Sequence, residues 1–535
     1  MIAIEGKTIG AVFDEATRTW PDAPFLIEPA KTGGAPRILS YAEAAAEVDR
    51  LSAALSAAGY GHGHRIATLI GNRPEFFLMR LAMNRLGISI VPVNPDYRAG
   101  EIAYLIDDSG ADLALAEASR RDLMAAGVAE AESGPPLVLF EDILAGPPPP
   151  AAPPPLSGPP TPATEASLVY TSGTTGRPKG CILSHEAELM YGESYLLIPP
   201  PIGLREASER ILNPLPLYHV NAGGITFFGV LLSGNAQVIP ERFSASNWWR
   251  DIRDTGATIF HYLGVIIPVL MADKTVGKAD IGALRCALGA GVEPALHDPF
   301  EERFGIPLIE CWGMTEMCRV LAIAEEPRMT DTRAIGRPRA GLEVRVLDQD
   351  GNEVPRGTPG EMCIRHSAET PGKGFFSGYH NKPEATAEAW RGGWFHTGDT
   401  VSMDESGMIF FIDRAKNIIR RSGENIAAAE VENCLFEDER VVAVACVAAP
   451  DEMRDEEVLA CVVLAEETEK NEATARALFD HAFRRLAYFK PPGWIRFMDA
   501  LPVTGTQKVL KHKIFQPDED PRAGAFDFRA LKRRG

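Results

Sequence analysis

The 535-residue chain lacks the features that define several common classes of protein. No apolar run approaches the ~20 residues that a membrane-spanning helix needs, so we expect no membrane span. The N-terminal segment MIAIEGKTIGAVFDEATRTW carries acidic residues early and has no long apolar core, which argues against a secretory signal peptide. The chain also shows no internal repeat.

Closely spaced cysteines are missing as well. The eight cysteines are scattered and form no C-x-x-C pair, which argues against a disulfide framework and a structural zinc site. A chain of this length can bury a large core without disulfides. We therefore expect reduced thiols and a cytoplasmic protein.

Basic residues are few relative to acidic ones. The chain has 54 Lys and Arg against 73 Asp and Glu, a formal net charge of −19. Such a balance argues against a nucleic-acid partner. The apolar content of 45% and the charged content of 24% are typical of a globular protein. The length alone predicts about two to four domains.

Alternating strand and helix patterns predict an α/β fold with mostly parallel sheets. Residues 41–60 carry apolar residues at helical spacing and end near Gly59. A strand, a helix and a second strand follow, as HRIATLIG, PEFFLMRLAMNRLG and ISIVPVN, which is typical of a βαβ unit. Similar alternation returns at 236–264. The proline-rich segment 146–164 predicts an extended, exposed loop.

The second half of the chain reads differently. From about residue 335, short strands such as GLEVRVLDQDGNEVP, with a D-G turn, predict an antiparallel, β-rich region. After about residue 414 a smaller unit begins, with its own strands and helices. We expect a large N-terminal domain over residues 1–414, containing mixed sheets, helices and a β-rich subdomain. A small α+β domain is expected over residues 415–535.

The string TSGTTGRPKG, residues 171–180, is typical of an anion-binding loop. Its glycines permit tight turns and leave amides uncovered, and several amides facing one way form an anion nest. Hydroxyls and a lysine add donors suited to a polyphosphate. A Walker A motif is not met, so a plain P-loop NTPase is not expected, and a flexible surface loop is the alternative. The candidate phosphate-binding residues are Thr171, Ser172, Gly173, Thr174, Thr175, Gly176 and Lys179.

This loop resembles the phosphate loop of the acyl-adenylate-forming (AMP-binding) enzymes, which include acyl-CoA synthetases, adenylation domains of peptide synthetases and luciferases. Further motifs of that family follow in order: CWGMTE at 311–316, GWFHTGD at 393–399, DRAKNIIRRSGENI at 413–426 and PVTGTQKVLK at 502–511. The resemblance spans nearly the whole chain. The GMTE string and the Gln507–Lys508 pair most resemble the corresponding motifs of crotonobetaine/carnitine-CoA ligases.

The resemblance implies an ATP-dependent acyl-CoA synthetase, with ATP, Mg²⁺ and coenzyme A as its cofactors. A carboxylate and ATP give an acyl-adenylate and pyrophosphate, and a thiol then displaces AMP. Such a first step depends on positioning and charge neutralisation. The implied partners are a small carboxylic acid and CoA, with neither nucleic acid nor a membrane span, and a homodimer is left open.

The resemblance also assigns roles to residues. Thr315 would contact the α-phosphate, and Glu316 resembles the family's magnesium ligand, a hard oxygen donor for a hard cation. Trp312 would lie near adenine or serve in core packing. The residues expected around adenine, ribose and phosphates are Gly289, Ala290, Gly291, Trp312, Gly313, Met314, Asp399 and Arg414.

Lys508 matches the catalytic lysine of the family, which lies on a small mobile domain. Lys416 matches the hinge, and Gly423 and Glu424 match the face that lines the thiol channel. One departure is Gln507, which stands where the family usually has glycine. It keeps open an enzyme specialised for one half-reaction, thioester formation from supplied acyl-adenylate.

The segment PLYHVNAG resembles the family's acyl site. His219 would gate the site or serve as a core histidine, and Val220 and Asn221 would lie beside the carboxylate. Cys318 and Arg319 are further candidates, and Arg319 would either pair with a polar or acidic substituent or point outward. The sequence leaves the acid open among carnitine-like, aromatic, fatty and polycyclic acids.

Other functions remain as alternatives. The acceptor could be a carrier protein, although the chain ends 27 residues beyond Lys508 without an appended carrier domain. A luciferase-like oxygenase would need product analysis to exclude. A non-catalytic nucleotide-binding module would bind nucleotide without turnover, and the presence of Glu316, Asp399 and Lys508 argues against it.

Overall fold

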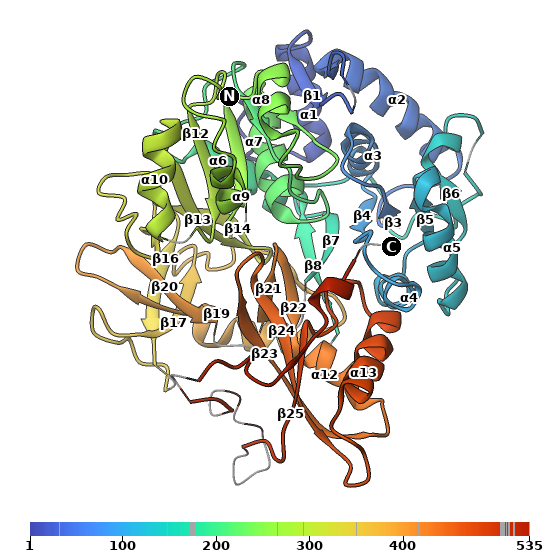
Figure 1. Cartoon of the computed structure of the whole chain (residues 1–535). Helices are drawn as coiled ribbons and strands as arrows, with labels where there is room; N and C mark the ends of the chain where they lie inside the picture. The colour runs from blue at the N-terminus through green and yellow to red at the C-terminus, as the bar shows by residue number, and fades with distance from the viewer. Residues whose placement is uncertain are drawn as a thin grey trace. The chain divides into compact units, whose positions relative to one another are not determined.

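The structure, a computed structural model, describes most of the chain as two compact units (Figure 1). The first unit comprises Met1–Pro95, Leu105–Tyr170 and Gly180–Asp413, and the second comprises Asp96–Tyr104, Thr171–Lys179 and Arg414–Gly535. Outside the described residues lie 32, 147, 172–176, 265, 293, 349, 415–417, 503–508, 510, 512–513, 517–518 and 534–535, as well as the side chains of 413, 414, 418, 425 and 429.

The first unit contains a seven-stranded sheet with the order β18-β8-β7-β4-β3-β5-β6. The pairs from β7 to β6 are parallel, whereas β18 is antiparallel to β8. The strands are β3 (Arg65–Leu69), β4 (Ser89–Pro92), β5 (Leu113–Ala116), β6 (Leu137–Leu139), β7 (Glu165–Thr171), β8 (Lys179–Ser184) and β18 (Gly378–Tyr379). Its associated helices include α3 (Pro74–Arg85) and α5 (Arg121–Glu130), and α4 (Ala99–Ser109) lies between β4 and β5 in the chain.

A second, eight-stranded sheet has the order β14-β13-β12-β11-β9-β10-β1-β2, parallel in its middle and antiparallel at both ends. Its strands are β1 (Pro24–Glu28), β2 (Arg37–Ser40), β9 (Arg210–Leu212), β10 (Ala236–Val238), β11 (Ile259–Leu263), β12 (Cys286–Ala290), β13 (Leu308–Met314) and β14 (Met317–Ala322). The helices of this part are α1 (Ile9–Thr19), α2 (Tyr41–Ala57), α6 (His185–Leu196), α7 (Phe227–Ser233), α8 (Trp248–Thr255), α9 (Ile266–Ala272) and α10 (Pro294–Phe304).

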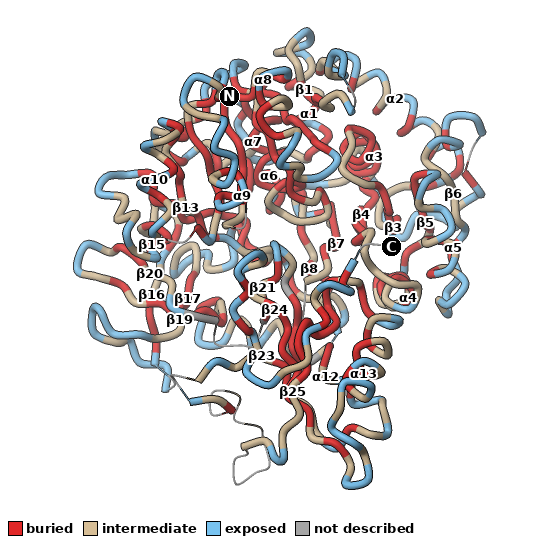
Figure 2. The backbone as a smooth tube through the Cα atoms, in the orientation of Figure 1, coloured by how far each residue is buried: buried red, intermediate tan, exposed pale blue. Residues whose placement is uncertain are grey.

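Helix α2 illustrates why these residues adopt this fold. The Ser40 hydroxyl accepts from the Glu43 amide at the N-terminus, and the Ser40 amide donates to the Glu43 carboxylate, which completes a capping box. Its buried residues recur at helical spacing and join the large apolar core of the first unit. Figure 2 shows which parts of the chain are buried, in red, and which are exposed, in pale blue.

The β-rich region of the first unit is a five-stranded sheet with the order β15-β20-β19-β17-β16 and antiparallel pairing where its register is defined. Its strands are β15 (Ala334–Gly336), β16 (Glu343–Leu347), β17 (Gly360–Arg365), β19 (Phe395–Met403) and β20 (Ile409–Arg414), and helix α11 (Pro383–Ala389) precedes β19. The described part of the proline-rich segment 146–164 forms neither helix nor strand and is mostly exposed.

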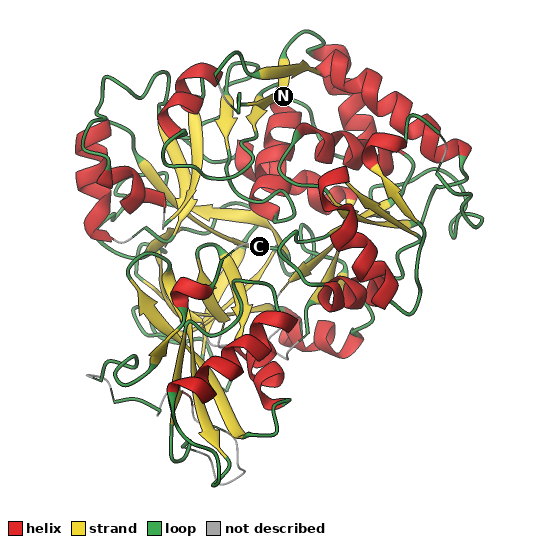
Figure 3. Ribbon diagram, turned by 45° about the vertical axis from the view of Figure 1, so that its right-hand side comes forward, coloured by secondary structure: helices red, strands yellow, loops and turns green. Residues whose placement is uncertain are grey.

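The second unit has its own sheet, with the order β22-β21-β24-β25-β26 and with β23 paired to β24. The strands are β21 (Ile418–Arg421), β22 (Glu424–Ala427), β23 (Val441–Asp451), β24 (Asp455–Leu464), β25 (Trp494–Phe497) and β26 (Phe526–Asp527). Helices α12 (Ala428–Phe436) and α13 (Glu472–Arg485) pack against one another within this unit (Figure 3). The expected α/β class, with a large N-terminal part and a smaller C-terminal part, is confirmed.

Two further findings bear on the sequence expectations. Among the described residues, no helix combines the length and apolar character needed to cross a membrane. All eight cysteines are described and buried, and none forms a disulfide.

Candidate active site

The motif expected at the α-phosphate forms a two-residue turn between β13 and β14. Met314 pairs with Met317 across this turn, so Thr315 and Glu316 form its tip. The Tyr191 hydroxyl, on α6, donates a hydrogen bond to the Thr315 carbonyl oxygen over 2.7 Å. The turn is therefore anchored to a buried helix.

Glu316, the expected magnesium ligand, is positioned by the segment that leads into β18. The Tyr379 hydroxyl donates to Glu316 Oε1 over 2.8 Å, and the Phe376 amide donates to the Glu316 carbonyl over 2.9 Å. Burial raises the pKa of Tyr379 well above its usual range, so this hydroxyl stays protonated and donates. A carboxylate is the kind of ligand that Mg²⁺ prefers, so Glu316 fits the expected role.

Trp312 and Asp399 come from separate motifs and meet in the structure. The Trp312 indole N–H donates to Asp399 Oδ2 over 2.8 Å, although the residues are 87 positions apart. Both are buried, at 6% and 2% exposure. Gly313 follows Trp312 at an irregularity in the β13–β14 register. The indole therefore orients the carboxylate that the sequence assigns to the ribose.

The glycine-rich end of β12 lies beside β13. A Cβ at Gly289 would lie 2.3 Å from the Tyr262 carbonyl oxygen, so only glycine fits there. Gly291 has φ +83°, and its amide donates to Glu310 Oε2 over 2.7 Å. The Tyr262 hydroxyl donates to the other oxygen of Glu310 over 2.8 Å. Burial raises the pKa of Glu310 to about 7, while these donors oppose the shift. Ala290 ends the strand between the two glycines.

His219 and Val220 line a small cavity in the first unit. The cavity encloses about 10 Å³, which is about the space that one water molecule needs. The Tyr218 and His219 rings lie 4.5 Å apart, centroid to centroid. The lining residues are Phe76, Arg80, Ile90, Pro92, Ser167, Val169, Glu188, Leu217, Tyr218, His219, Val220, Gly223 and Gly224.

Asn221 does not line this cavity but begins a π-helix, Asn221–Thr226, whose residues join a buried polar network. Asn221 Oδ1 accepts from Asn213 Nδ2 and pairs with His261 Nδ1, both over 2.9 Å. An amide oxygen only accepts, so His261 donates through Nδ1 and accepts the Tyr195 hydroxyl at Nε2, over 2.8 Å. Burial lowers the pKa of His261 to about 3, so the ring is neutral. Short π-helical segments are frequent at functional sites.

A buried ion pair borders the cavity. Arg80 Nη2 lies 2.5 Å from Glu188 Oε1, and Arg80 Nη1 donates to the Gly223 carbonyl oxygen over 2.5 Å. Ser167 also donates to Glu188. Burial raises the pKa of Glu188, while Arg80 opposes the shift. Arg80 thereby ties α3 to the π-helix that follows His219.

Cys318 and Arg319 lie on β14 and do not line the cavity. Cys318 is fully buried, and burial raises the pKa of its thiol. Arg319 is 9% exposed, which differs from an outward-pointing surface residue.

The sequence candidates of the second unit are described only in part. Thr171 ends β7 and Lys179 begins β8. Gly423 has φ +91° in the turn between β21 and β22, and Glu424 begins β22. Outside the described residues lie Ser172, Gly173, Thr174, Thr175, Gly176, Lys416, Gln507 and Lys508, and the Arg414 side chain is not described either.

Four positioning residues escaped the sequence analysis. Tyr379 and Glu310 hold predicted site residues, but they belong to none of the motifs that carried the resemblance. Arg80 and Glu188 did leave a signal, because each is a charged residue within a helix whose neighbouring positions are buried. Such a charge in a buried helix indicates a partner on another element.

Comparison with known proteins gives a consistent result. Residues 13–380 match the family described as AMP-binding enzyme, and residues 430–508 match its C-terminal domain. The chain is 33% identical to the sulfoacetate–CoA ligase of Cupriavidus necator, over 95% of this chain and 97% of that protein. It is 29% identical to the crotonobetaine/carnitine–CoA ligase of Proteus mirabilis, over 89% and 93%.

Solved structures share the fold. The o-succinylbenzoate CoA synthetase of Bacillus subtilis, bound to a product analogue, superposes with a TM-score of 0.81. It is 24% identical, and the match covers 95% of this chain and 98% of that one. An amide bond synthetase from Marinactinospora thermotolerans gives a TM-score of 0.79 at 24% identity, covering 95% and 99%.

Proposed function

The chain belongs to the AMP-binding enzyme family, and from that premise we propose that it is an ATP-dependent acid–thiol ligase. In the first half-reaction a carboxylate oxygen attacks the α-phosphorus of ATP, giving acyl-AMP and pyrophosphate. In the second, the CoA thiolate attacks the acyl carbon and AMP leaves with that oxygen. The hydrogen bond between Trp312 and Asp399, next to the Thr315–Glu316 turn, is the observation that carries the proposal.

In the first half-reaction the described residues hold the nucleotide. Asp399 accepts the ribose hydroxyls, and the indole of Trp312 keeps its carboxylate oriented for this task. The glycine-rich end of β12 would lie beside adenine, and Gly289 packs against Tyr262 too closely for any side chain. Thr315 contacts the α-phosphate from the tip of its anchored turn. Correct placement of the reacting atoms supplies much of the rate enhancement in such reactions.

We propose that Glu316 binds Mg²⁺. When bound, the cation neutralises phosphate charge in the transition state. Tyr379 fixes one oxygen of this carboxylate by a hydrogen bond of 2.8 Å, which limits the rotation of the side chain. The phosphate loop, Thr171–Lys179 with the intervening residues, would hold the β- and γ-phosphates.

The small domain, residues 415–535, would supply Lys508 to the reacting carboxylate and would swing about Lys416 between the two half-reactions. In the second state Gly423 and Glu424 would line the path of the thiol. The positive φ of Gly423 supports a tight turn at this point. Coenzyme A is the proposed acceptor rather than a carrier protein, because the similar curated proteins are CoA ligases. Eight buried cysteines without a disulfide support a cytoplasmic location.

Mass spectrometry of the products tests the proposal. Purified enzyme is given ATP, magnesium, CoA and a panel of aliphatic, aromatic, carnitine-like and sulfonated acids. We expect an acyl-CoA, AMP and pyrophosphate from at least one free acid. ADP as the product, or ATP binding without turnover of any acid, would contradict a ligase.

An enzyme specialised for thioester formation is the second candidate, and Gln507 favours it. Parallel reactions with supplied acyl-adenylate separate the two. Thioester from the adenylate but never from the free acid would identify the specialised enzyme. Activity in both arms would identify the full ligase.

A further inference from the structure

Arg319 has a largely buried side chain for which the described residues provide no partner. It lies on β14 with 9% of its surface exposed. Within the described part of the chain it donates no hydrogen bond, joins no ion pair and stacks on no ring, and its buried Nε is unsatisfied. A guanidinium stays protonated in proteins, so this charge cannot be relieved by titration.

The surroundings of the guanidinium are backbone and sulfur rather than acid. A Cβ at Gly374 would lie 2.9 Å from both Arg319 Nε and the Met190 Cε, so only glycine leaves this space open. A Cβ at Gly341 would lie 3.6 Å from Arg319 Nη1 and 3.3 Å from His366 Nε2. Glycines at both positions let the backbone approach the charged group closely.

The neighbouring charges do not neutralise Arg319. Glu193 is the acid whose field acts on it, but no ion pair joins the two. His366 feels the positive charges of both Arg319 and Lys373, which lower its pKa together with burial. Burial also lowers the pKa of Arg319 itself. The surroundings of Arg319 therefore carry too little negative charge to balance its guanidinium.

Arg319 also lies close to the reacting centre in the chain. The segment 374–376 runs along β14: the Cys318 amide donates to the Gly374 carbonyl, and the Phe376 amide donates to the Glu316 carbonyl, both over 2.9 Å. Arg319 is three residues beyond Glu316, roughly 10 Å along an extended strand.

An unpaired buried charge is expensive, and proteins retain one mainly where function needs it. The cost of desolvating Arg319 has already been met in the free protein, so an anion of the right shape gains a charge-assisted pair without a further rearrangement. We propose that Arg319 binds a second anionic group of the acid substrate, a carboxylate or a sulfonate remote from the reacting carboxylate. This inference rests on the proposed ligase function.

Three acids of nearly the same shape test the proposal. Sulfoacetate, 3,3-dimethylbutyrate and glycine betaine carry a negative, neutral or positive group at the same position beside the same carboxylate. We expect the wild-type kcat/KM to rank sulfoacetate, or malonate as its carboxylate counterpart, above the neutral acid and the cation last. Comparing the two dianions distinguishes sulfonate from carboxylate recognition.

Arg319→Met should lower the ratio of kcat/KM between the dianion and the neutral acid about 100-fold or more, as expected for loss of a desolvated charge pair. Arg319→Lys should give an intermediate ratio, because it keeps the charge and loses the planar fork. A wild-type preference for the neutral or cationic acid would overturn the proposal, as would an unchanged ratio in Arg319→Met.

Binding of two adenylate analogues separates this inference from the ligase proposal. Sulfoacetyl and 3,3-dimethylbutyryl sulfamoyl-adenosine need no turnover to bind. We expect the wild type to bind the sulfoacetyl analogue more tightly, and Arg319→Met to lose this difference. If the difference persists in Arg319→Met, the inference fails even where thioester forms. If the difference is lost but no acid is converted, the inference stands and the ligase proposal fails.

Melting temperature excludes a merely structural role. Since Arg319 has no partner in the described fold, the unliganded Arg319→Met protein should melt at or above the wild-type temperature. The matched control is Arg80→Met, which strands Glu188 in the core and should melt lower. A fall in Arg319→Met as large as in Arg80→Met, with all acids affected equally, would contradict the proposal.

Discussion

At the scale of single residues, the site is built from side chains that hold other side chains. Trp312 orients Asp399, Tyr379 orients Glu316, and Glu310 fixes the Gly291 amide. Trp312 is buried, whereas Tyr379 and Glu310 are partly exposed. Their loss should change the geometry of nucleotide binding more than the stability of the fold.

Trp312→Phe removes the indole donor but keeps an aromatic ring. We expect the KM for ATP to rise roughly 10-fold, because Asp399 loses one charge-assisted hydrogen bond of about 1.5–3 kcal/mol. Steady-state kinetics with ATP as the varied substrate measures this effect. The control is Trp249→Phe, an equally buried residue that stacks on Phe304. Equal effects of the two variants on KM would count against the orienting role.

His261 makes a prediction about pH. Its folded pKa of about 3 lies below the ordinary value of 6.5, so the unfolded chain binds more protons between these values and stability falls as pH drops below about 6.5. The loss at pH 5 is about 2 kcal/mol relative to pH 7. Urea unfolding at both pH values should show that His261→Gln lowers this difference by about that amount. An unchanged pH dependence in the variant would show that this ring does not titrate as described.

At the scale of elements, the sequence indicated the strands and turns that carry motifs, but not what anchors them. A helix over residues 41–60 was predicted from its apolar spacing, and the structure has it over Tyr41–Ala57 with a capping box at Ser40. The π-helix at Asn221–Thr226 could not be predicted, because its network depends on His261 and Tyr195, far away in the chain. Long-range contacts of this kind leave no local periodicity.

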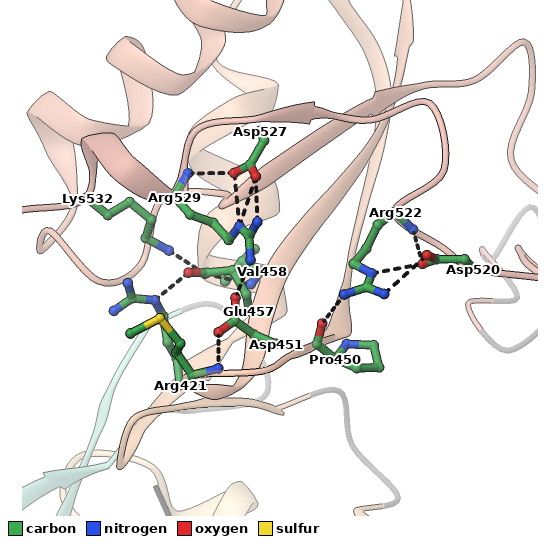
Figure 4. Close-up of polar contacts among 11 residues, drawn as sticks. Arg421, Pro450, Asp451, Glu457, Val458, Asp520, Arg522, Asp527, Arg529 and Lys532 are labelled. Carbon is green, nitrogen blue, oxygen red and sulfur yellow. Dashed lines mark hydrogen bonds and ion pairs between the residues drawn. The ribbon is translucent and has the colours of Figure 1, made fainter. Parts of the chain in front are cut away.

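The C-terminal segment of the second unit is tied to its sheet by a buried charge cluster (Figure 4). Glu457, on β24, pairs with Arg421 Nε over 2.6 Å and with Lys532 Nζ over 2.5 Å. All three side chains are almost completely buried. Burial lowers the pKa of Lys532 to about 7, although Glu457 opposes the shift. Glu457 thus binds two basic side chains, Arg421 and Lys532.

This cluster predicts an order of stabilities. Glu457→Gln leaves the buried Arg421 guanidinium without its ion pair and should cost about 3–5 kcal/mol of unfolding free energy, whereas Lys532→Met keeps the pair of Arg421 and Glu457 and should cost less. Chemical denaturation of both variants, followed by circular dichroism, measures the difference. A larger loss of unfolding free energy in Lys532→Met than in Glu457→Gln would show that Glu457 is not the central residue of the cluster.

At the scale of the whole molecule, the family and the α/β class were accessible from the sequence, because five motifs occur in order along nearly the whole chain. The acid was not accessible, since the motifs concern the proposed nucleotide site, whereas recognition of the acid would depend on contacts that form only in the folded chain. Only the folded chain reveals that Arg80 has a buried partner, while Arg319 has none among the residues that the structure describes.

The proposed division of labour between the two domains gives a further prediction. Lys508→Ala should abolish formation of acyl-adenylate, because the variant loses the charge that we propose neutralises the reacting groups, yet should largely spare thioester formation from supplied adenylate. Pyrophosphate release and thioester formation are measured separately in the same preparation. Equal loss of both half-reactions would contradict the assignment of Lys508 to the first one alone.

The central claim is that the acid is activated as an acyl-adenylate, and isotope transfer tests it most directly. The enzyme is given an acid that it converts, labelled with ¹⁸O in its carboxylate, together with ATP, magnesium and CoA. The mass of the AMP product is then measured by mass spectrometry. The account predicts one ¹⁸O in each AMP, because the attacking carboxylate oxygen leaves with the phosphate. Unlabelled AMP, or label found in inorganic phosphate alongside ADP, would contradict it.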